Sequence, residues 1–311
     1  MPATPEDVCV VGLDVGGTST RAVVATREGA VARATGPGSN PVSLGYAVAL
    51  ATWEALADEA LDDYAARHGH RPRVEHCVVG GAGAGSYPAE EPAALERLRL
   101  VTGARRRPTL TSDVVVAFAS VSDGADGLVV VAGTGAVAAR VRDFRLSAFV
   151  DGNGWFVGDA GSGHWIGVEA VKAALATFQA GPRTALAAAV ADAAGLALEW
   201  SALVQWVYGR PPRALAALAP VVRDAAAAGD AVATDILDRA AAALVASLAR
   251  LDPAADDGAV VLAGTIARSE DLLHGRLARA ITARWGLGVR AGGDGAMGAA
   301  RIAWREVDAA G

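Results

Sequence analysis

The chain has 311 residues, enough for two domains of ordinary size, and 52% hydrophobic against 20% charged residues predicts a large core rather than disorder. Its formal net charge of −6 argues against a nucleic-acid partner, because binding a phosphate backbone requires clustered Lys and Arg. The N-terminal residues lack the basic start and apolar centre of a signal peptide, and no segment has about 18 uninterrupted apolar residues. We therefore expect a cytoplasmic protein without membrane contact.

The first third of the chain reads as strands followed by helices. The run DVCVVGLDV predicts a strand buried on both faces, and two further strands follow around a turn at Glu28 and Gly29. Apolar residues recur at spacings of three and four from Tyr46 to about Arg67, which predicts an amphipathic helix with Ser43 as its candidate N-cap. VEHCVVGGAG then predicts a strand, PAALERLRLVTG a helix that ends at Gly103, and RPTLTSD a short strand.

Two cysteines, Cys9 and Cys77, lie in two of these predicted strands. Their apolar neighbours favour buried thiols over a disulfide. The chain contains no CxxC, so the sequence gives no support for a zinc site or a cysteine-ligated cluster.

The strand pattern returns in the second half. LVVVAGTGAVAARVR, at 128–142, predicts a strand, a Gly-Thr-Gly turn and a second strand, and FRLSAFVDG continues it. The segment from about Ser162 to Arg250 is helical in pattern, AVVLAGTIA is a late buried strand, and two helices follow it. The repeat of strand, glycine-threonine turn, strand and strand predicts two related α/β lobes with a cleft between them, where ligands commonly bind.

The glycine turns have the chemistry of phosphate sites. In GLDVGGTST, Gly16 and Gly17 allow a tight turn whose N–H groups form an anion-binding concavity, and Thr18 adds a hydroxyl. Asp14 stands at the end of the strand, where a carboxylate beside phosphates suits Mg²⁺. One such turn is equally a simple hairpin. A second at 133–135 favours a triphosphate held from both sides, and a third, LAGTIARS at 262–269, could hold the adenosine.

Five motifs in this order resemble those of the actin-like ATPase superfamily, which includes sugar kinases. GLDVGGTST, VVAGTGAVA and VVLAGTIARS resemble its two phosphate motifs and its adenosine motif, while GGAGAG (80–85) and DGAMGAA (294–300) resemble its connecting motifs. The resemblance covers nearly the whole chain. It implies an α/β fold of two duplicated actin-like (ribonuclease H-like) lobes with an interlobe cleft, formed by residues 1–114 plus 296–311 and by residues 115–295.

The same resemblance implies ATP and Mg²⁺ as cofactors, with Asp14 holding the metal. The residues that it assigns to ATP are Gly16, Gly17, Thr18, Ser19, Gly133, Thr134, Gly135, Gly264 and Thr265.

Within the superfamily the chain resembles the N-acetylglucosamine kinases and their BadF/BadG-type relatives. Asp113, in TSDVVVAF, follows a strand and precedes a short helix, so it could be an N-cap, but it matches the aspartate that takes the proton of the acceptor hydroxyl. The glycine-rich stretch DGNGWFVGDAGSGHWIG (151–167) resembles their sugar-binding segment. The resemblance implies sugar contacts from Asn40, Gly81, Asp113, Asp151, Asn153, Gly154, Trp155 and Asp159.

Three departures from that subfamily surround the expected sugar. Ala160 replaces a glutamate, Ala136 and Val137 replace Ser-Asn, and Asp151 is an additional acid. A buried carboxylate could pair with a sugar ammonium but gives nothing to an acetamide, although Asp151 could also be a solvated turn residue. We therefore expect phosphorylation of glucosamine to glucosamine 6-phosphate, as in the glucosamine kinases of actinobacteria. The alternative is an N-acetylglucosamine kinase or a broader hexose and amino-sugar kinase.

Other classes within the superfamily fit less well. An activator ATPase of the acyl-CoA dehydratase type needs cysteines for a cluster at a dimer interface, and Cys9 and Cys77 have the wrong spacing. A sugar-responsive repressor would carry an N-terminal helix-turn-helix, whereas the first strand begins by about residue 7. We expect a small-molecule amino sugar as the partner. The sequence leaves the oligomeric state open, a homodimer included.

Overall fold

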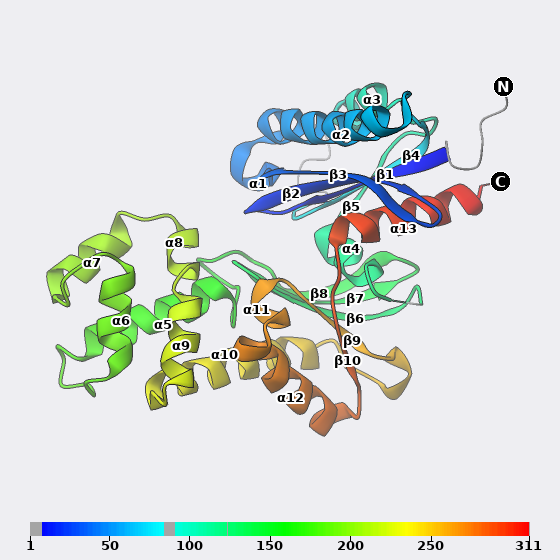
Figure 1. Ribbon diagram of the computed structural model, residues 1–311. Coiled ribbons are helices and arrows are strands. Elements are labelled where there is room, and N and C mark those ends of the chain that lie inside the picture. The colour runs from blue at the N-terminus through cyan, green and yellow to red at the C-terminus, as the bar shows by residue number, and fades with distance from the viewer. Residues whose placement is uncertain (1–7, 84–90, 123, 311) are drawn as a thin grey trace. The chain divides into compact units, whose positions relative to one another are not determined.

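The computed structural model describes residues 8–83, 91–122 and 124–310. The chain forms two compact units (Figure 1). Unit 1 comprises Met1–Asp126, Val141–Leu146 and Gly292–Gly311, and unit 2 comprises Gly127–Arg140 and Ser147–Ala291. Residues 115–126 thus pack with unit 1, whereas the sequence placed the first lobe boundary after residue 114.

Unit 1 is built on a five-stranded sheet in the order β3-β2-β1-β4-β5. Strands β1 (Val8–Val15), β2 (Ser19–Thr26) and β3 (Gly29–Pro37) are antiparallel neighbours, and β4 (Arg73–Gly81) and β5 (Thr109–Ser112) continue the sheet parallel to β1. Helices α2 (Tyr46–His68) and α3 (Glu91–Thr102) cover one face, and α4 (Asp113–Ala119) and α13 (Gly295–Asp308) the other (Figure 1). Strand β1 is therefore buried on both faces, as its apolar run predicts.

The predicted cap of α2 is wrong. Ser43 lies inside a short helix, α1 (Pro41–Leu44), whose N-cap is Asn40, and α2 begins after Gly45. Proline favours the first position of a helix, and Pro41 starts α1. The side-chain cap therefore belongs to α1, through Asn40, and not to α2 as the apolar spacing suggests.

Unit 2 repeats the strand order of unit 1. Its sheet runs β10-β9-β6-β7-β8, which matches β5-β4-β1-β2-β3 position for position. This order confirms the predicted duplication. Strand β10 was not predicted, because three residues are too few for a periodic pattern. The strands are β6 (Gly127–Ala132), β7 (Ala136–Arg142), β8 (Arg145–Asp151), β9 (Val260–Ala263) and β10 (Val289–Ala291).

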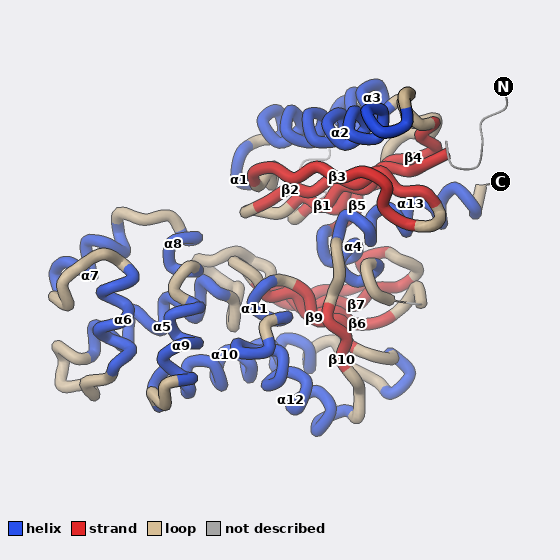
Figure 2. Tube along the Cα trace, in the orientation of Figure 1, coloured by secondary structure: helices blue, strands red, loops and turns tan. Residues whose placement is uncertain are grey.

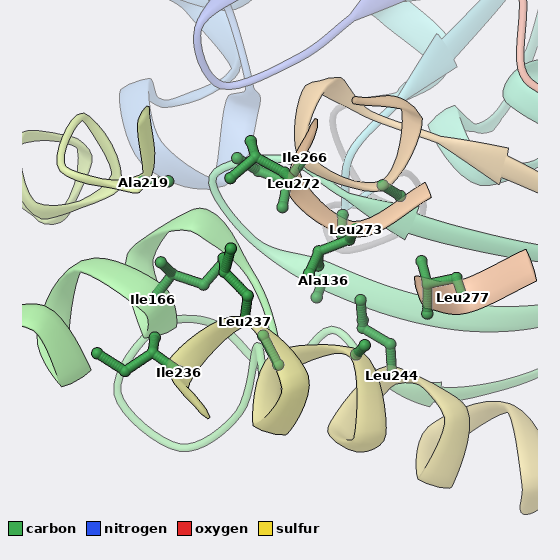
Figure 3. Close-up of a cluster of buried hydrophobic side chains, with 14 of the residues drawn as sticks. Ala136, Ile166, Ala219, Ile236, Leu237, Leu244, Ile266, Leu272, Leu273 and Leu277 are labelled. Atoms are coloured by element: carbon green, nitrogen blue, oxygen red, sulfur yellow. The ribbon is translucent and has the colours of Figure 1, made fainter. Parts of the chain in front are cut away.

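The helices of unit 2 follow β8 and β9 in the chain. Figure 2 draws these helices in blue beside the red strands of the sheet. Their apolar side chains meet those of the sheet in one cluster, in which Ala136 of β7 lies among residues of α5, α10 and η3 (Figure 3). Helix α5 buries two alanines and helix α10 buries three. The helices are α5 (Gly163–Ala176), α6 (Ala185–Ala193), α7 (Trp200–Tyr208), α8 (Pro212–Ala216), α9 (Ala219–Ala227), α10 (Ala231–Ala249), η2 (Ala255–Asp257), α11 (Thr265–Arg268), η3 (Glu270–His274) and α12 (Gly275–Trp285).

Both cysteines are buried and free, as predicted. Burial raises the pKa of the Cys9 thiol to about 12 and raises that of Cys77 as well. Within the described ranges, no helix has the length and apolar character needed to cross a membrane.

Candidate functional site

The first predicted phosphate turn, residues 16–18, is held by backbone hydrogen bonds. The N–H of Gly16 donates to the carbonyl of Ser19 at 3.0 Å, and the N–H of Gly38 donates to the carbonyl of Thr18 at 3.1 Å. A side chain on Gly38 would overlap the carbonyl of Gly17. The segment that follows β3 therefore packs directly on the turn and fixes its shape.

A chain of buried polar groups supports the same turn from the side of α2. The hydroxyls of Thr20 and Ser39, both fully buried, lie 2.5 Å apart, and the indole N–H of Trp53 donates to the Ser39 hydroxyl at 3.1 Å. Asn40 is next in the chain, and its carboxamide oxygen accepts from the N–H of Val42 at 2.8 Å. The cap bond orients this predicted sugar residue.

The carboxyl ends of three parallel strands align beside the turn. In the register of the sheet, Val15 of β1 is opposite Gly81 of β4, and Gly81 is opposite Ser112 of β5. Asp14 precedes the first of these residues and Asp113 follows the last. Parallel strands end at the same sheet edge, which is where ligands bind in open α/β sheets, so both aspartates belong to one edge. Residues 84 and 85 of the first connecting motif lie outside the described residues.

Asp113 is the first residue of α4, and the N-cap is its neighbour Ser112. One oxygen of the Asp113 carboxylate accepts from the N–H of Val114 at 2.9 Å and from the Ser112 hydroxyl at 3.1 Å. Burial raises the pKa of the Asp113 carboxyl, although these hydrogen bonds act in the opposite direction. Because the cap position is occupied by Ser112, the N-cap alternative does not account for Asp113.

Two glycines bring α4 close to its neighbours. A side chain on Gly80 of β4 would overlap the side chain of Val116 in α4. A side chain on Gly298 of α13 would overlap the carbonyl oxygen of the same Val116. Both glycines belong to the predicted connecting motifs. Their function in unit 1 is close packing, which sets the position of the helix that carries Asp113.

Asp14 lies in a crowded acidic environment. Its pKa is raised from the ordinary value of 3.8 to about 6, first by burial and then by the charge of Asp113, with a further contribution from Asp294; Arg21 opposes the rise. The guanidinium of Arg21 is 3.3 Å from the Asp14 carboxylate. The carboxylate also lies against Gly295, where a Cβ would be 2.6 Å from one of its oxygens.

This environment suits a divalent cation, which would offset the repulsion among the carboxylates. In the part of the chain that the structure describes, no three His, Cys, Asp or Glu side chains gather to hold a metal by themselves. Mg²⁺ is usually held by one or two carboxylates together with water and substrate phosphates. Asp14 fits the role of such a carboxylate.

In unit 2 the second and third predicted nucleotide turns lie side by side. The N–H of Gly133 donates to the carbonyl of Gly135 at 2.9 Å, and the N–H of Gly163 donates to the carbonyl of Gly133 at 2.8 Å. Gly264, with a φ of 82°, lies against the end of β6, where a Cβ would overlap the carbonyl of Ala132. Thr265 starts α11 immediately afterwards. Three segments far apart in sequence therefore meet at the turn that contains Thr134.

Two aspartates hold the glycine-rich loop of unit 2 in shape. Asp151 accepts from the N–H of Asp159 at 2.7 Å with one carboxylate oxygen and from the N–H of Ala160 at 2.9 Å with the other. Asp159 is 8% exposed, and its carboxylate accepts from the N–H of Ala136 at 3.1 Å. Burial raises the pKa of Asp159, and the charge of Asp151 adds to the rise. Asp151 is therefore neither a solvated turn residue nor a carboxylate without partners.

The tip of this loop exposes aromatic side chains. Trp155 and Phe156 are 54% and 82% exposed, and their rings meet edge to face with centroids 5.6 Å apart. The other edge contact of Trp155 is with His164, at 5.7 Å. Gly154, with a φ of 87°, begins the turn, and Asn153 beside it is exposed. An exposed aromatic ring with polar neighbours can bind the apolar face of a sugar.

Residues 11–303 of the chain match the model of a known protein family, the BadF/BadG/BcrA/BcrD ATPase family. The chain belongs to this family. Its match spans both predicted phosphate turns, Asp113 and the glycine-rich loop, so these segments of both units belong to this family's domain.

Two curated relatives of this BadF/BadG family chain are sugar kinases. It is 31% identical over 181 residues to the N-acetylmuramic acid/N-acetylglucosamine kinase of Clostridium acetobutylicum, covering 56% of this chain and 58% of that kinase. It is 29% identical over 251 residues to the N-acetyl-D-glucosamine kinase of Dictyostelium discoideum, covering 75% of this chain and 76% of that kinase. The first alignment thus spans less than two thirds of the Clostridium kinase.

A solved structure has the same fold as this BadF/BadG family chain. It is a protein of Chromobacterium violaceum, provisionally assigned as an N-acetylglucosamine kinase. The TM-score is 0.69 at 25% identity, and the match covers 94% of this chain and 97% of the other. The fold likeness extends over both units.

Within the family fold, each unit gathers its own predicted site residues. Unit 1 brings together Asp14, the 16–18 turn, Gly81 and Asp113, and unit 2 brings together the 133–135 turn, Gly264 and the 151–159 loop. Sequence reasoning missed most of the groups that support the first turn or surround Asp14, because contacts between distant segments leave no periodic signal. Those groups are Ser39, Trp53, Arg21 and Asp294.

Proposed function

We propose that this protein is an ATP-dependent sugar kinase that transfers the γ-phosphoryl group to the 6-hydroxyl of an N-acetylhexosamine, with N-acetylglucosamine as the first candidate. The observation that carries the proposal is the strand register of unit 1. It aligns a half-buried carboxyl, Asp113, with the predicted phosphate turn and with Asp14 at one edge of the sheet. A base for the acceptor hydroxyl and a holder for a metal are the two carboxylate functions that phosphoryl transfer needs.

Asp113 would orient the sugar hydroxyl and accept its proton as the oxygen attacks the γ-phosphorus. A carboxyl whose pKa is raised by burial is the stronger base once it is ionised. Its hydrogen bonds to Ser112 and Val114 use one oxygen, which leaves the other to face an acceptor. The backbone N–H groups of the two glycine turns would bind the phosphates, and Mg²⁺ near Asp14 would neutralise charge on them.

The choice of sugar rests on the relatives. Both curated relatives are named for N-acetylated sugars, which supports the N-acetylhexosamine over the free amine that the sequence favoured. The sequence argument for glucosamine relied on Asp151 pairing with an ammonium, yet both oxygens of this carboxylate accept backbone hydrogen bonds. Glucosamine stays the second candidate, because Ala136, Val137 and Ala160 replace the polar residues expected near an acetamide.

The activator ATPase class has little support, because Cys9 and Cys77 are buried in the core of unit 1. Cluster ligands must be thiolates, and burial raises the pKa of both thiols.

The test is ADP release with N-acetylglucosamine, glucosamine, N-acetylmuramic acid and glucose in parallel, with and without a chelator. We expect the fastest sugar-dependent turnover with N-acetylglucosamine, and loss of turnover when the metal is chelated. Faster turnover with glucosamine would instead establish the second candidate. Absence of sugar-stimulated ADP release with all four sugars would refute the kinase proposal. Phosphorus NMR of the product would identify the modified hydroxyl.

A further inference from the structure

The glycine-rich loop and the second phosphate turn of unit 2 are connected through two carboxylates in series. Asp151, the last residue of β8, accepts from the N–H groups of Asp159 and Ala160. Asp159 in turn accepts from the N–H of Ala136, the residue after the turn. The two carboxylates therefore join the base of the loop to the turn.

We propose that Asp151 is a positioning residue that couples the acceptor loop to the second phosphate turn, acting through Asp159. This role rests on the proposed kinase function but differs from direct recognition of a sugar. If Asp151 contacted only the sugar, its loss would affect the sugar alone. If it holds Asp159 in place, its loss changes nucleotide binding even when no sugar is present.

The backbone of the two aspartates supports this reading. Asp151 and Asp159 have φ values of 68° and 60°, in the left-handed region that residues with a side chain seldom adopt. Such conformations persist where surrounding contacts impose them, and they cluster at functional sites. Here each aspartate is held in this conformation while its carboxylate bonds to the backbone of another segment.

Close approaches at two glycines show how little space surrounds the carboxylates. A Cβ on Gly158 would overlap an oxygen of Asp151, and a Cβ on Gly135 would lie 2.8 Å from an oxygen of Asp159. The backbone of Gly158 is not in the left-handed region, so its φ does not exclude a side chain. An alanine at 158 would therefore displace the intact Asp151 carboxylate, and it would also press on Asn153, whose Cβ would lie 2.9 Å from the added one.

Two variants and a matched control separate this role from simple loss of stability. Asp151→Asn replaces one acceptor oxygen with an NH₂ group that cannot accept from the loop, and Gly158→Ala displaces the intact carboxylate. The control is Asp230→Asn in unit 2. Asp230 accepts from the N–H groups of Leu186, Val232 and Ala233, so its carboxylate likewise holds the backbone of two separate segments, at the start of α10.

The first readout is the rise in Tm caused by AMP-PNP without sugar, followed by steady-state kinetics with each substrate varied. We expect both loop variants to lose most of the AMP-PNP effect. Their kcat/KM should fall by about a hundredfold for nucleotide and sugar alike, the usual effect of displacing reacting groups by about 1 Å. The control should lower Tm and leave both kinetic constants unchanged. An unchanged AMP-PNP effect with a raised KM for sugar alone would overturn the proposal.

A second readout does not depend on catalysis. Amide hydrogen exchange at Ala136 should accelerate in both loop variants, together with exchange at Asp159 and Ala160. Slow exchange at Ala136 in the variants would refute the coupling, even if the parent protein turns over no sugar. Failure of the proposed function would appear separately, as a parent protein without sugar-dependent ADP release.

Discussion

Asp14→Asn should make the protein more stable at neutral pH, although it removes the predicted metal ligand. The Asp14 carboxyl has an ordinary pKa of 3.8 in the unfolded chain and a pKa of about 6 in the folded one, chiefly because of burial. Between these two values the folded state binds more protons than the unfolded state. The free energy of unfolding of the parent therefore falls as the pH rises through this window.

The magnitude follows from the two pKa values. Their difference corresponds to at most about 3 kcal/mol, fully present above pH 7, small near pH 3.8 and lost below it. The Asp14 side chain is 20% exposed, so solvent screens little of this effect. Asparagine has the shape of the protonated carboxyl and no charge. The variant should match the parent near pH 4 and exceed it by up to about 3 kcal/mol at pH 7.

The assay is thermal unfolding of both proteins from pH 4 to pH 8 without divalent metal. A control is Asp308→Asn, because Arg27 lowers the pKa of this exposed carboxyl and its neutralisation should give no gain at pH 7. An Asp14→Asn protein that is less stable than the parent at pH 7, or whose advantage does not change with pH, would refute the electrostatic account. Millimolar Mg²⁺ with ADP should stabilise the parent more than the variant.

Four further outcomes are expected. Asp113→Asn should abolish sugar-dependent ADP release and keep the Tm rise with AMP-PNP, because it removes the base and retains the helix start; a fully active variant would remove its assigned role. In the parent, kcat/KM should fall with decreasing pH at a higher pH than an ordinary aspartate gives, since the pKa of Asp113 is raised. Gly298→Ala should destabilise unit 1 by about 1–3 kcal/mol, because its Cβ would overlap the carbonyl of Val116, and an unchanged Tm would contradict that packing. Glu306→Ala should lower Tm, because the carboxylate accepts from Thr109 and pairs with buried His76. The pKa of Glu306 is lowered, so the difference from the parent should shrink as the pH falls below about 4.5, and a difference that grows there would contradict the reading.

The fold was largely predictable because its strands are either apolar throughout or end at glycine turns. Strands β1, β4, β6 and β9 are buried runs, and their turns have a composition that marks phosphate sites. The repeated order of strands and turns predicted the duplication that the two sheets share.

The rest could not be predicted because it depends on contacts between distant segments. Nothing near Asp14 in the sequence indicates that Gly295 lies against it. The local sequence of Asp151 suggested a ligand or a solvated turn, and only the folded loop brings the N–H groups of Asp159 and Ala160 to its carboxylate. The cap of α2 failed for a similar reason, since the apolar spacing did not reveal the break at Gly45.

Helix α13 belongs to unit 1 but is synthesised after all of unit 2. This helix packs on β1, with Gly295 against Asp14 and Gly298 against Val116 of α4. The ribosome nevertheless makes α13 about 280 residues after β1. At about 5–20 residues per second, the first sheet waits on the order of tens of seconds with only α4 on the face that α13 later shares. All of unit 2 emerges during that interval and can fold first. The nascent chain therefore completes the acidic edge of unit 1 late, which would delay nucleotide binding until α13 has been made.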